Sequence, residues 1–516
     1  MKYLLSISAA LLLVASQIQP ASAQSNPADL IKQAIEAQGG ADALRALKTL
    51  VIKGEAKHWE PGQSFKAGGE AKFLGDSTYT VTADIANRTV RVDWDRDMKY
   101  PAVERIKFSE TVYPTFGIVT DAKGAVRPMS GIRVASHQRE YGRGSPFLLL
   151  RASESPQNLA AIADQKIGDQ TLPAVVFTQD GTKYIIAFDR TSKLPVAVRT
   201  RDDDHIYGDS SYDVILADWK AVGGAKLAHS LSFRLNGGEV QRLTYKEVSA
   251  NTAIPPETFA IADQHKTAAL ASASSDVPYQ WVLRRMFLGR FLDSDAVYYP
   301  PGGGFKLAEL APNVQHVVGG GANNLIVAMK DGIVVFDAPV NEGQSRWVID
   351  AAKAKYPGKP IKYLVLTHHH MDHTGGMRAY VAEGATVIVP TPTKAYFEQV
   401  AKAAHTISPD AQQKQMKPAK IEEVKDSRSL KDDTIEINLH NIENPHAEGM
   451  IIVHVVKENV VFVTDLLSPR GPVARTPGTA AVGNALRKHN IAGATIAGGH
   501  GTTAKQAEIG PALAAN

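Results

Sequence analysis

The chain of 516 residues contains no cysteine. Disulfide bridges, thiolate metal ligands and lipid attachment at an N-terminal cysteine are therefore all excluded. The formal net charge is only +4, from 57 basic and 53 acidic residues, and this balance gives no indication of nucleic-acid binding. Beyond the first residues, no apolar run reaches the length of a membrane span. The composition is that of a globular protein, and the length predicts at least two domains.

The N-terminus carries the one marked apolar segment. Lys2 precedes a short apolar core, and Ala21-Ser-Ala23 gives a small-x-small pattern before Gln24. This pattern predicts a secretory signal peptide over residues 1–23, cleaved after Ala23, with a retained anchor as the alternative. Together with the absence of cysteine, it predicts a periplasmic or secreted protein without an integral membrane span after signal removal.

A dense group of ligand-type side chains lies near the middle of the second half. Thr367 to Gly375 reads Thr-His-His-His-Met-Asp-His-Thr-Gly. The run contains the pattern His-x-His-x-Asp-His, at His368, His370, Asp372 and His373. Neutral imidazole and carboxylate are donors that zinc accepts, and the apolar run Ile361 to Leu366 before them predicts a strand whose end could aim them at one point. A solvated histidine-rich loop is the alternative, but it needs no Asp at a fixed offset.

Further candidate ligands follow beside other strand-like runs. His446 lies between two apolar segments, Asp465 ends the run that starts at Val460, and His500 lies in a Gly-Gly-His-Gly turn. Asp337 follows a similar run further upstream. Taken singly, each is weak, because a lone Asp after a strand often forms a turn. Their position at strand ends is where open α/β sheets place their ligands.

With these motifs in order, residues from about 311 to 510 resemble a metallo-β-lactamase-fold hydrolase, which implies an αββα sandwich. The resemblance implies a first metal site of three histidines, a second site, a bridging carboxylate and an Asp that orders the loop beneath them. The first site would be formed by His368, His370 and His446, and the second by Asp372, His373 and His500. Asp465 would be the bridging carboxylate, and Asp337 would order the loop. It implies two zinc ions, with iron or manganese as alternatives, and Asp372 as the catalytic residue that orients the nucleophile or accepts its proton.

The ligand set also narrows the chemistry that the resemblance implies. The absence of cysteine excludes the β-lactamase subclasses with a Cys ligand, and a bridging Asp465 resembles the thioesterase, lactonase, phosphodiesterase and alkylsulfatase branches. We expect a hydroxide held between two metal ions to attack an ester, lactone or thioester of a small molecule, ahead of a phosphodiester or alkyl sulfate. The alternatives are a β-lactamase-type amide hydrolase, a mononuclear iron oxygenase of the same fold, and a catalytically silent periplasmic binding or carrier protein.

Residues 24–264 have a different pattern, typical of an antiparallel β-rich accessory domain. Short helices are predicted at Ala28–Glu36, Ala41–Leu47 and near Ser145–Ala152. Alternating segments predict strands at Leu50–Lys57, Gly69–Phe73, Thr78–Ala83, Thr89–Trp94, Ala174–Thr178, Tyr184–Asp189, Val196–Arg201, His229–Leu235 and Val240–Val248. Phe188–Pro195, Ala217–Trp219 and Leu243–Val248 resemble periplasmic lipoprotein carriers. That resemblance implies an incomplete barrel around a helix, with room for an apolar or amphiphilic ligand; the alternative is a scaffold that binds nothing.

The two halves are joined by a predicted linker at residues 265–305. Within it, Trp281–Phe291 predicts an interdomain helix, with a contact to an anionic membrane surface as the alternative. The catalytic domain is then expected at residues 306–516. Loop placement makes Asn324, Tyr396 and His405 candidate substrate contacts. No pattern predicts the oligomeric state.

Overall fold

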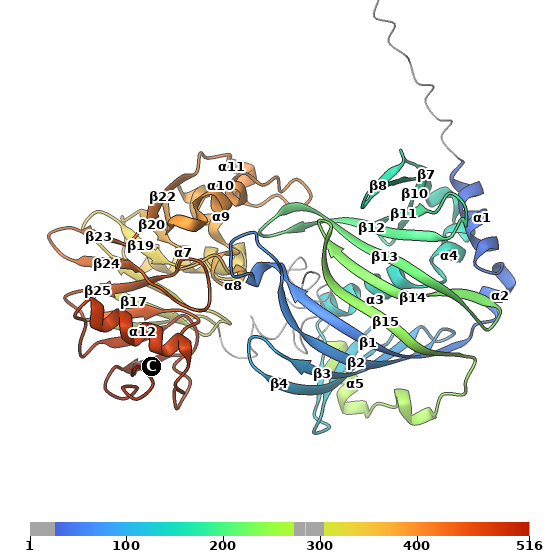
Figure 1. Cartoon of the computed structure of the whole chain (residues 1–516), viewed down its shortest axis with the longest axis horizontal. Helices are drawn as coiled ribbons and strands as arrows, with labels where there is room; N and C mark the ends of the chain where they lie inside the picture. The colour runs from blue at the N-terminus through green and yellow to red at the C-terminus, as the bar shows by residue number, and fades with distance from the viewer. Residues whose placement is uncertain (1–25, 273–283, 285–303, 515–516) are drawn as a thin grey trace, which may run out of the picture.

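The computed structural model describes residues 26–272, residue 284 and residues 304–514. The predicted signal peptide and almost all of the helix predicted at Trp281–Phe291 lie outside these residues. Figure 1 shows an N-terminal unit built on one broad, curved sheet beside a C-terminal unit built on two smaller sheets. None of the described helices is both long and apolar enough to cross a membrane.

The N-terminal unit is a 13-stranded sheet in the order β6-β5-β4-β3-β2-β1-β15-β14-β13-β12-β11-β10-β7. Its strands are β1 (Thr49–Glu60), β2 (Lys72–Asp84), β3 (Thr89–Met98), β4 (Glu104–Val112), β5 (Gly117–Asp121), β6 (Val126–Pro128), β7 (Leu159–Ala161), β10 (Ala174–Gln179), β11 (Thr182–Phe188), β12 (Pro195–Asp204), β13 (Gly208–Val222), β14 (Ala225–Leu235) and β15 (Gly238–Ala250). A separate hairpin pairs β8 (Gln165–Ile167) with β9 (Gln170–Leu172). Every pairing is antiparallel and the sheet is open, which confirms the predicted antiparallel domain.

Helices cover part of this sheet. They are α1 (Pro27–Ala37), α2 (Ala41–Arg45), α3 (Gly131–Gly144), α4 (Leu148–Glu154) and α5 (Asp263–Ala271), with 3-10 turns η1 (Pro61–Gln63), η2 (Pro156–Asn158) and η3 (Pro256–Phe259). The side chain of Asn26 accepts from the Ala28 amide and Pro27 begins α1, a combination that favours a helix start. The helix buries Leu30, Ile31, Ala34 and Ile35, one face of its 3.6-residue period, against α4 and the neighbouring strands.

Most of the predicted strands are confirmed, and two differences have physical reasons. Gly69–Phe73 and Thr78–Ala83 were expected as separate strands, but β2 runs unbroken over Lys72–Asp84. A register shift opposite Gly75, whose φ is +146°, marks an irregularity within the strand where we expected a turn. The sequence pattern also missed α3, because the buried face of that helix carries Arg133, His137 and Arg143 instead of an apolar stripe.

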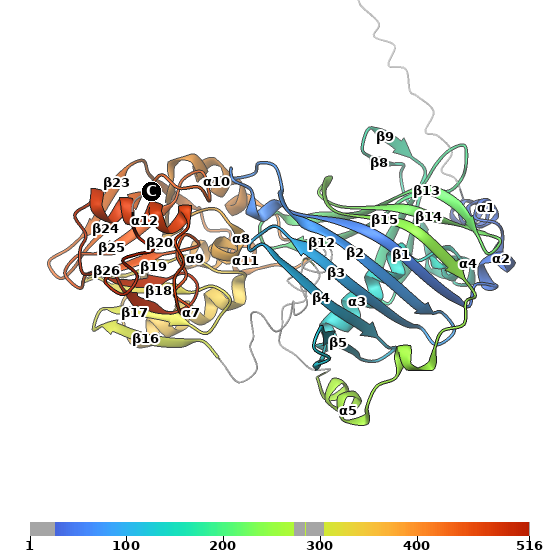
Figure 2. The ribbon, with the colours of Figure 1, turned by 60° about the horizontal axis from the view of Figure 1, so that its bottom comes forward.

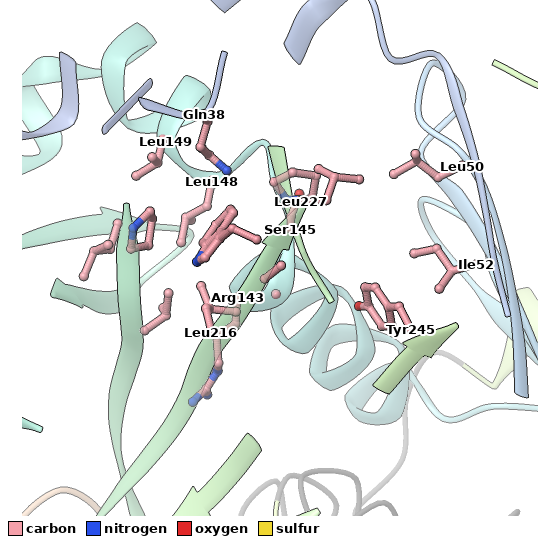
Figure 3. Close-up of a pocket in the computed structure, with 17 residues that line it drawn as sticks. Gln38, Leu50, Ile52, Arg143, Ser145, Leu148, Leu149, Leu216, Leu227 and Tyr245 are labelled. Carbon is pink, nitrogen blue, oxygen red and sulfur yellow. The ribbon is translucent and has the colours of Figure 1, made fainter. Parts of the chain in front are cut away.

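An apolar cavity of about 50 Å³ lies between α4 and the sheet (Figure 3). Leu148 and Leu149 of α4 face Leu50, Ile52 and other side chains of the sheet across it. Pockets that hold small ligands measure about 300–1,000 Å³. The cavity therefore has room for only a short apolar group, and the lipoprotein-carrier resemblance stays a prediction.

The C-terminal unit is an αββα sandwich, as the resemblance implied. One sheet contains β16 (Lys306–Ala311), β17 (Val314–Val318), β18 (Asn324–Ala328), β19 (Ile333–Phe336), β20 (Ile361–Val365), β21 (Thr386–Pro390) and β22 (Lys420–Val424). The other contains β23 (Ser427–Lys431), β24 (Glu436–Asn441), β25 (Ile451–Val455), β26 (Val460–Val463), β27 (Thr495–Gly498) and β28 (Thr503–Lys505). The helices are α7 (Glu342–Lys355), α8 (Met371–Thr374), α9 (Met377–Glu383), α10 (Lys394–Lys402), α11 (Ala411–Gln415) and α12 (Pro477–Lys488), with the 3-10 turn η4 (Thr391–Thr393).

The sandwich follows from strands that are apolar on both faces. In β19, Ile333 and Val335 pack toward α7 and α9, whereas Val334 and Phe336 pack toward the second sheet. The alternation of side chains along a strand thus feeds two separate cores. Helix α12 covers the outer face of the second sheet in the same way. Figure 2 shows the two sheets between their helices.

Candidate metal centre

The predicted ligands come together at one edge of the sandwich. They lie in the loop and the short helix α8 after β20, in the loops after β26 and β27, and between β24 and β25, so elements far apart in sequence meet there. Two groups of donor atoms each lie within 4.8 Å of one another: His368, His370, His446 and Asp465 in the first, and Asp372, His373, Asp465 and His500 in the second. The partition is the one that the resemblance implied, with Asp465 common to both groups.

Asp465 faces each group with a different oxygen atom. Its Oδ2 lies 3.1 Å from Nε2 of His368 and 2.8 Å from Nε2 of His446. Its Oδ1 lies 2.9 Å from Nε2 of His373 and 2.8 Å from Nε2 of His500. A carboxylate in this position can bridge two cations, one on each oxygen.

The hydrogen bonds around the second group show that it is built for a cation. Nδ1 of His500 lies 2.7 Å from the carbonyl oxygen of Gly321, and Nδ1 of His373 lies 2.8 Å from Oδ2 of Asp337. Both acceptors require a proton on Nδ1, so in the neutral rings both Nε2 atoms present lone pairs. These two nitrogen atoms are 3.2 Å apart and both face Asp465. Lone pairs and a carboxylate directed at one point require a positive charge between them.

The first group is oriented in the same manner. Nε2 of His370 lies 3.0 Å from the carbonyl oxygen of Ser64, which again requires the proton on that nitrogen. Nδ1 of His370 is buried without a hydrogen-bond partner and lies 3.8 Å from Oδ2 of Asp465. Nδ1 of His368 lies 3.1 Å from the Thr367 hydroxyl, which leaves its Nε2 directed at Asp465. Outer hydrogen bonds of this kind fix the tautomer of metal-binding histidines, so the donor set fits two divalent ions.

Two carboxylates of the site have unusual backbone angles. Asp337 has φ +62° and Asp465 has φ +32°, in a region that residues other than glycine seldom adopt. Asp337 is fully buried, and its carboxylate accepts from the amide of Thr367 at 2.8 Å as well as from His373. Such strain at a site is typical of function, because the surrounding structure must hold it in place.

The pKa shifts describe the same demand for positive charge. Burial lowers the pKa of His368 well below its ordinary value. Burial also lowers the pKa of His373, but Asp465 and Asp337 outweigh it and hold that pKa well above the ordinary value. For Asp465, burial raises the pKa, but His373 and His500 outweigh it and keep the carboxylate ionised.

The N-terminal domain also reaches this site, which the sequence did not indicate. Gln63 and Ser64, from the turn between β1 and β2, form hydrogen bonds with Asp372 and His370 respectively. Pro61-Gly62 marks a turn in the sequence, but no local pattern shows what the turn contacts. The contact of Thr367 with His368 could have been inferred, because the two residues are adjacent in the chain. The contact of the Gly321 carbonyl with His500 could not, because 179 residues separate them.

The structure shows the surroundings of the three residues predicted as substrate contacts, and that role stays a prediction. Asn324 is fully buried and donates to the carbonyl of Asp337 at 2.6 Å, so it supports the loop beneath the ligands. His405 is 2% exposed and lies beside Asp203, at a cavity of about 190 Å³ between the domains. Tyr396 lies 6.1 Å, ring to ring, from His369, an unassigned histidine whose Nε2 also donates to Ser64.

Comparison with known proteins agrees with this geometry. Residues 317–501 match the family model of the metallo-beta-lactamase superfamily. A linear primary-alkylsulfatase from Pseudomonas sp. is 37% identical over 62 residues, which is 12% of this chain and 9% of the length of that relative. The C-terminal domain therefore has the metallo-β-lactamase fold.

Solved structures of low sequence identity are also similar to part of the chain. A metallo-beta-lactamase from Pontibacter korlensis is 15% identical with a TM-score of 0.32, over 41% of this chain and 97% of its own. A stereoselective inverting sec-alkylsulfatase from Pseudomonas sp. is 18% identical with a TM-score of 0.31, over 40% of each chain.

Proposed function

We propose that the chain is an exported hydrolase that uses two zinc ions to cleave an ester-type bond in a small amphiphilic molecule. The observation that carries this proposal is the position of Asp465, whose two oxygen atoms face two separate groups of ligand-type side chains. Imidazole and carboxylate donors without sulfur suit zinc, with iron or manganese as alternatives.

Each side chain has a distinct task in this proposal. His368, His370 and His446 would hold the first ion and Asp372, His373 and His500 the second, with Asp465 shared. When bound, such a pair of ions lowers the pKa of water toward about 7 and polarises a substrate oxygen. Asp337 and the Gly321 carbonyl keep the protons of His373 and His500 on Nδ1, away from the reacting side. Asp372 keeps Oδ2 toward this group, 3.8 Å from Nε2 of His500, where it can orient a nucleophile or accept its proton.

Two observations bear on the substrate. Phe65 exposes 48% of its surface directly after Ser64, which gives the surroundings of the site an apolar side chain. The relative with 37% identity over its matched segment is named an alkylsulfatase. The sequence favours carboxylic esters, lactones and thioesters as substrates. The name of the relative supports alkyl sulfates as a second candidate class. Both classes join a polar group to an apolar chain.

A catalytically silent carrier is the competing class. A site without metal would leave several imidazole lone pairs and two carboxylates facing one another inside the protein, an arrangement that costs free energy and gains nothing. The periplasmic or secreted location remains part of the proposal, and it is tested by sequencing the N-terminus of the mature protein, which should begin at Gln24.

The function is tested by metal analysis and a substrate panel on the purified full-length chain. We expect about two zinc ions per chain and hydrolysis of alkyl sulfates or of carboxylic esters, lactones or thioesters, in a panel that also holds β-lactams and phosphodiesters. His370→Ala should lose this activity. His454→Ala is the matched control, since His454 lies on β25 of the same domain and bonds to Asn459. A chain without bound metal, or equal activity in wild type and His370→Ala, would reject the proposal.

A further inference from the structure

The turn between β1 and β2 crosses from the N-terminal domain to the candidate metal centre. In Figure 1 the blue turn that contains η1 lies next to α8, the short helix that begins at Met371. The carbonyl oxygen of Ser64 accepts from Nε2 of His369 at 2.8 Å and from Nε2 of His370 at 3.0 Å. One backbone carbonyl of the N-terminal domain thus fixes which nitrogen of a predicted metal ligand carries the proton.

A side chain of the same turn holds Asp372. Nε2 of Gln63 donates to Oδ1 of Asp372 at 2.6 Å, and the hydroxyl of Tyr100 donates to Oε1 of Gln63 at 2.5 Å. The phenol therefore orients the amide so that its NH₂ group faces the carboxylate. Because Oδ1 is engaged, Oδ2 is the oxygen of Asp372 that remains toward His373 and His500. Gln63 is only 5% exposed, so this contact is shielded from water.

The turn fits closely against the metal-binding loop. A Cβ atom on Gly62 would lie 2.6 Å from Cγ and 3.0 Å from Cβ of Met371, so only glycine allows this approach. Met371 is 1% exposed and stands between His370 and Asp372 in the chain. A displacement of the turn would therefore move both ligands.

Buried charges fix the base of the turn. Oε1 of Glu60 accepts from the amide of Gly62 at 3.0 Å and from Arg284 at 3.0 Å. Arg284 also donates to Asp204 at 2.6 Å, and all three charged side chains are fully buried. Arg284 contacts both carboxylates, so the loss of any one of the three side chains would leave a buried charge without its partner, and this holds the base of the turn in one geometry.

We propose that the N-terminal β-domain is a working part of the metal centre, in which Gln63 is a positioning residue for Asp372 and the turn Pro61–Ser64 sets the affinity for the metal ions. This inference rests on the proposed function. It assigns the accessory domain a role that does not require it to bind a ligand of its own.

The test measures zinc affinity by competition with a chromophoric chelator on the full-length chain. Outer hydrogen bonds to metal ligands change affinity by about 10- to 100-fold. We expect Gln63→Leu to weaken one of two zinc sites by this factor and to leave the other nearly unchanged. Gln63→Glu keeps the shape but places a carboxylate against Asp372, so it should weaken the same site, whereas a purely structural role predicts no loss. Tyr100→Phe should give a smaller loss in the same direction.

Matched controls separate positioning from folding. Gln241→Leu removes another buried glutamine of the same domain, and Tyr113→Phe removes a hydroxyl that donates to the carbonyl of Phe259. Both should keep two wild-type affinities. Visible absorption of the cobalt-substituted protein should change for Gln63→Leu and not for the controls. Gly62→Val, which forces the turn away from Met371, should weaken both sites.

The outcomes separate this inference from the proposed function. Unchanged zinc affinities and cobalt spectra in the Gln63 variants would overturn the inference, even if the chain hydrolyses esters. Loss of one zinc site in Gln63→Leu would support it, even if no substrate of the panel is cleaved. A wild-type chain that binds no zinc would overturn both.

Discussion

The two domains bury their strands in different ways, and the difference explains how they share the site. Every residue of β18 and β19 in the C-terminal domain is buried, because a helix layer covers one face and a second sheet covers the other. In the N-terminal domain, β1 alternates buried and exposed positions along its central part. Strands fixed on both faces can hold ligands at their ends in one geometry. An open sheet contributes instead through a turn, here Pro61–Ser64.

The largest effect is expected at Asp465, which the C-terminal domain places between the two groups of candidate ligands. We expect Asp465→Ala to lose metal binding and to lower kcat/KM by about 1000-fold or more, since the ions supply several kcal/mol of stabilisation and each 1.4 kcal/mol is a factor of ten. Zinc content and hydrolysis rates measure this. Asp433→Ala is the control, because Asp433 pairs with Lys330 at the surface. If the Asp465 variant kept both ions, the bridging role would be wrong.

The second prediction concerns the junction that holds the turn in place. Arg284→Met removes the cation that compensates Glu60 and Asp204, and breaking a buried pair in this way costs about 3–5 kcal/mol. The free energy of unfolding, measured by denaturant titration, should fall by that amount. Arg105→Met removes an exposed partner of Asp95 and should change stability by less than about 1 kcal/mol. If both variants lost the same free energy of unfolding, the buried ion group at Arg284 would contribute no more to stability than an exposed ion pair.

The third prediction concerns pH and a histidine between the domains. Burial lowers the pKa of His205 to about 4, so the folded chain binds this proton less well than the unfolded chain, where the pKa is 6.5. The unfolded state therefore gains protons first on acidification. The resulting stability is complete above pH 6.5 and is lost as the pH falls toward 4, by about 1–3 kcal/mol.

Denaturant midpoints at pH 7 and pH 5 check this. His205→Gln should make the difference between the two midpoints smaller, whereas His265→Gln, on α5, should leave it as in wild type. An unchanged difference in the His205 variant would contradict the assignment of the proton to this residue.

The smallest effect is expected at Phe65, and it tests whether the N-terminal domain also contacts the substrate. Phe65→Ala should raise KM for long-chain esters by about 3- to 10-fold and leave short-chain esters unchanged, since partial burial of one aromatic ring contributes about 1 kcal/mol. Met416→Ala removes an exposed apolar side chain of the C-terminal domain, 71% exposed, and should have no effect. A chain-length preference that survives in Phe65→Ala would place substrate contacts elsewhere.

The local sequence pattern was sufficient to predict most of the strands and the set of candidate ligands. It was insufficient to predict the buried contacts around them. The antiparallel sheet of the N-terminal domain was predicted from alternating segments, which are a local property, whereas the αββα sandwich was implied by the resemblance that the ordered ligand motifs carry. Helix α3 was missed because Arg133 pairs with Glu110 of β4 inside the domain, so a charged side chain occupies a buried position. Asn324 and His405 were predicted as substrate contacts from loop placement alone, which does not reveal that both side chains are buried.

The sequence by itself determined which side chains can hold metal, since His368, His370, Asp372 and His373 lie within six positions and the others follow strand-like runs. Tertiary structure decided how they are held. The Ser64 carbonyl that accepts a hydrogen bond from Nε2 of His370, and the Gln63 amide that donates to one oxygen of Asp372, come from about 300 residues earlier in the chain. Hydrogen bonds between distant segments leave no periodicity in a sequence, because each requires only a donor and an acceptor brought together by folding.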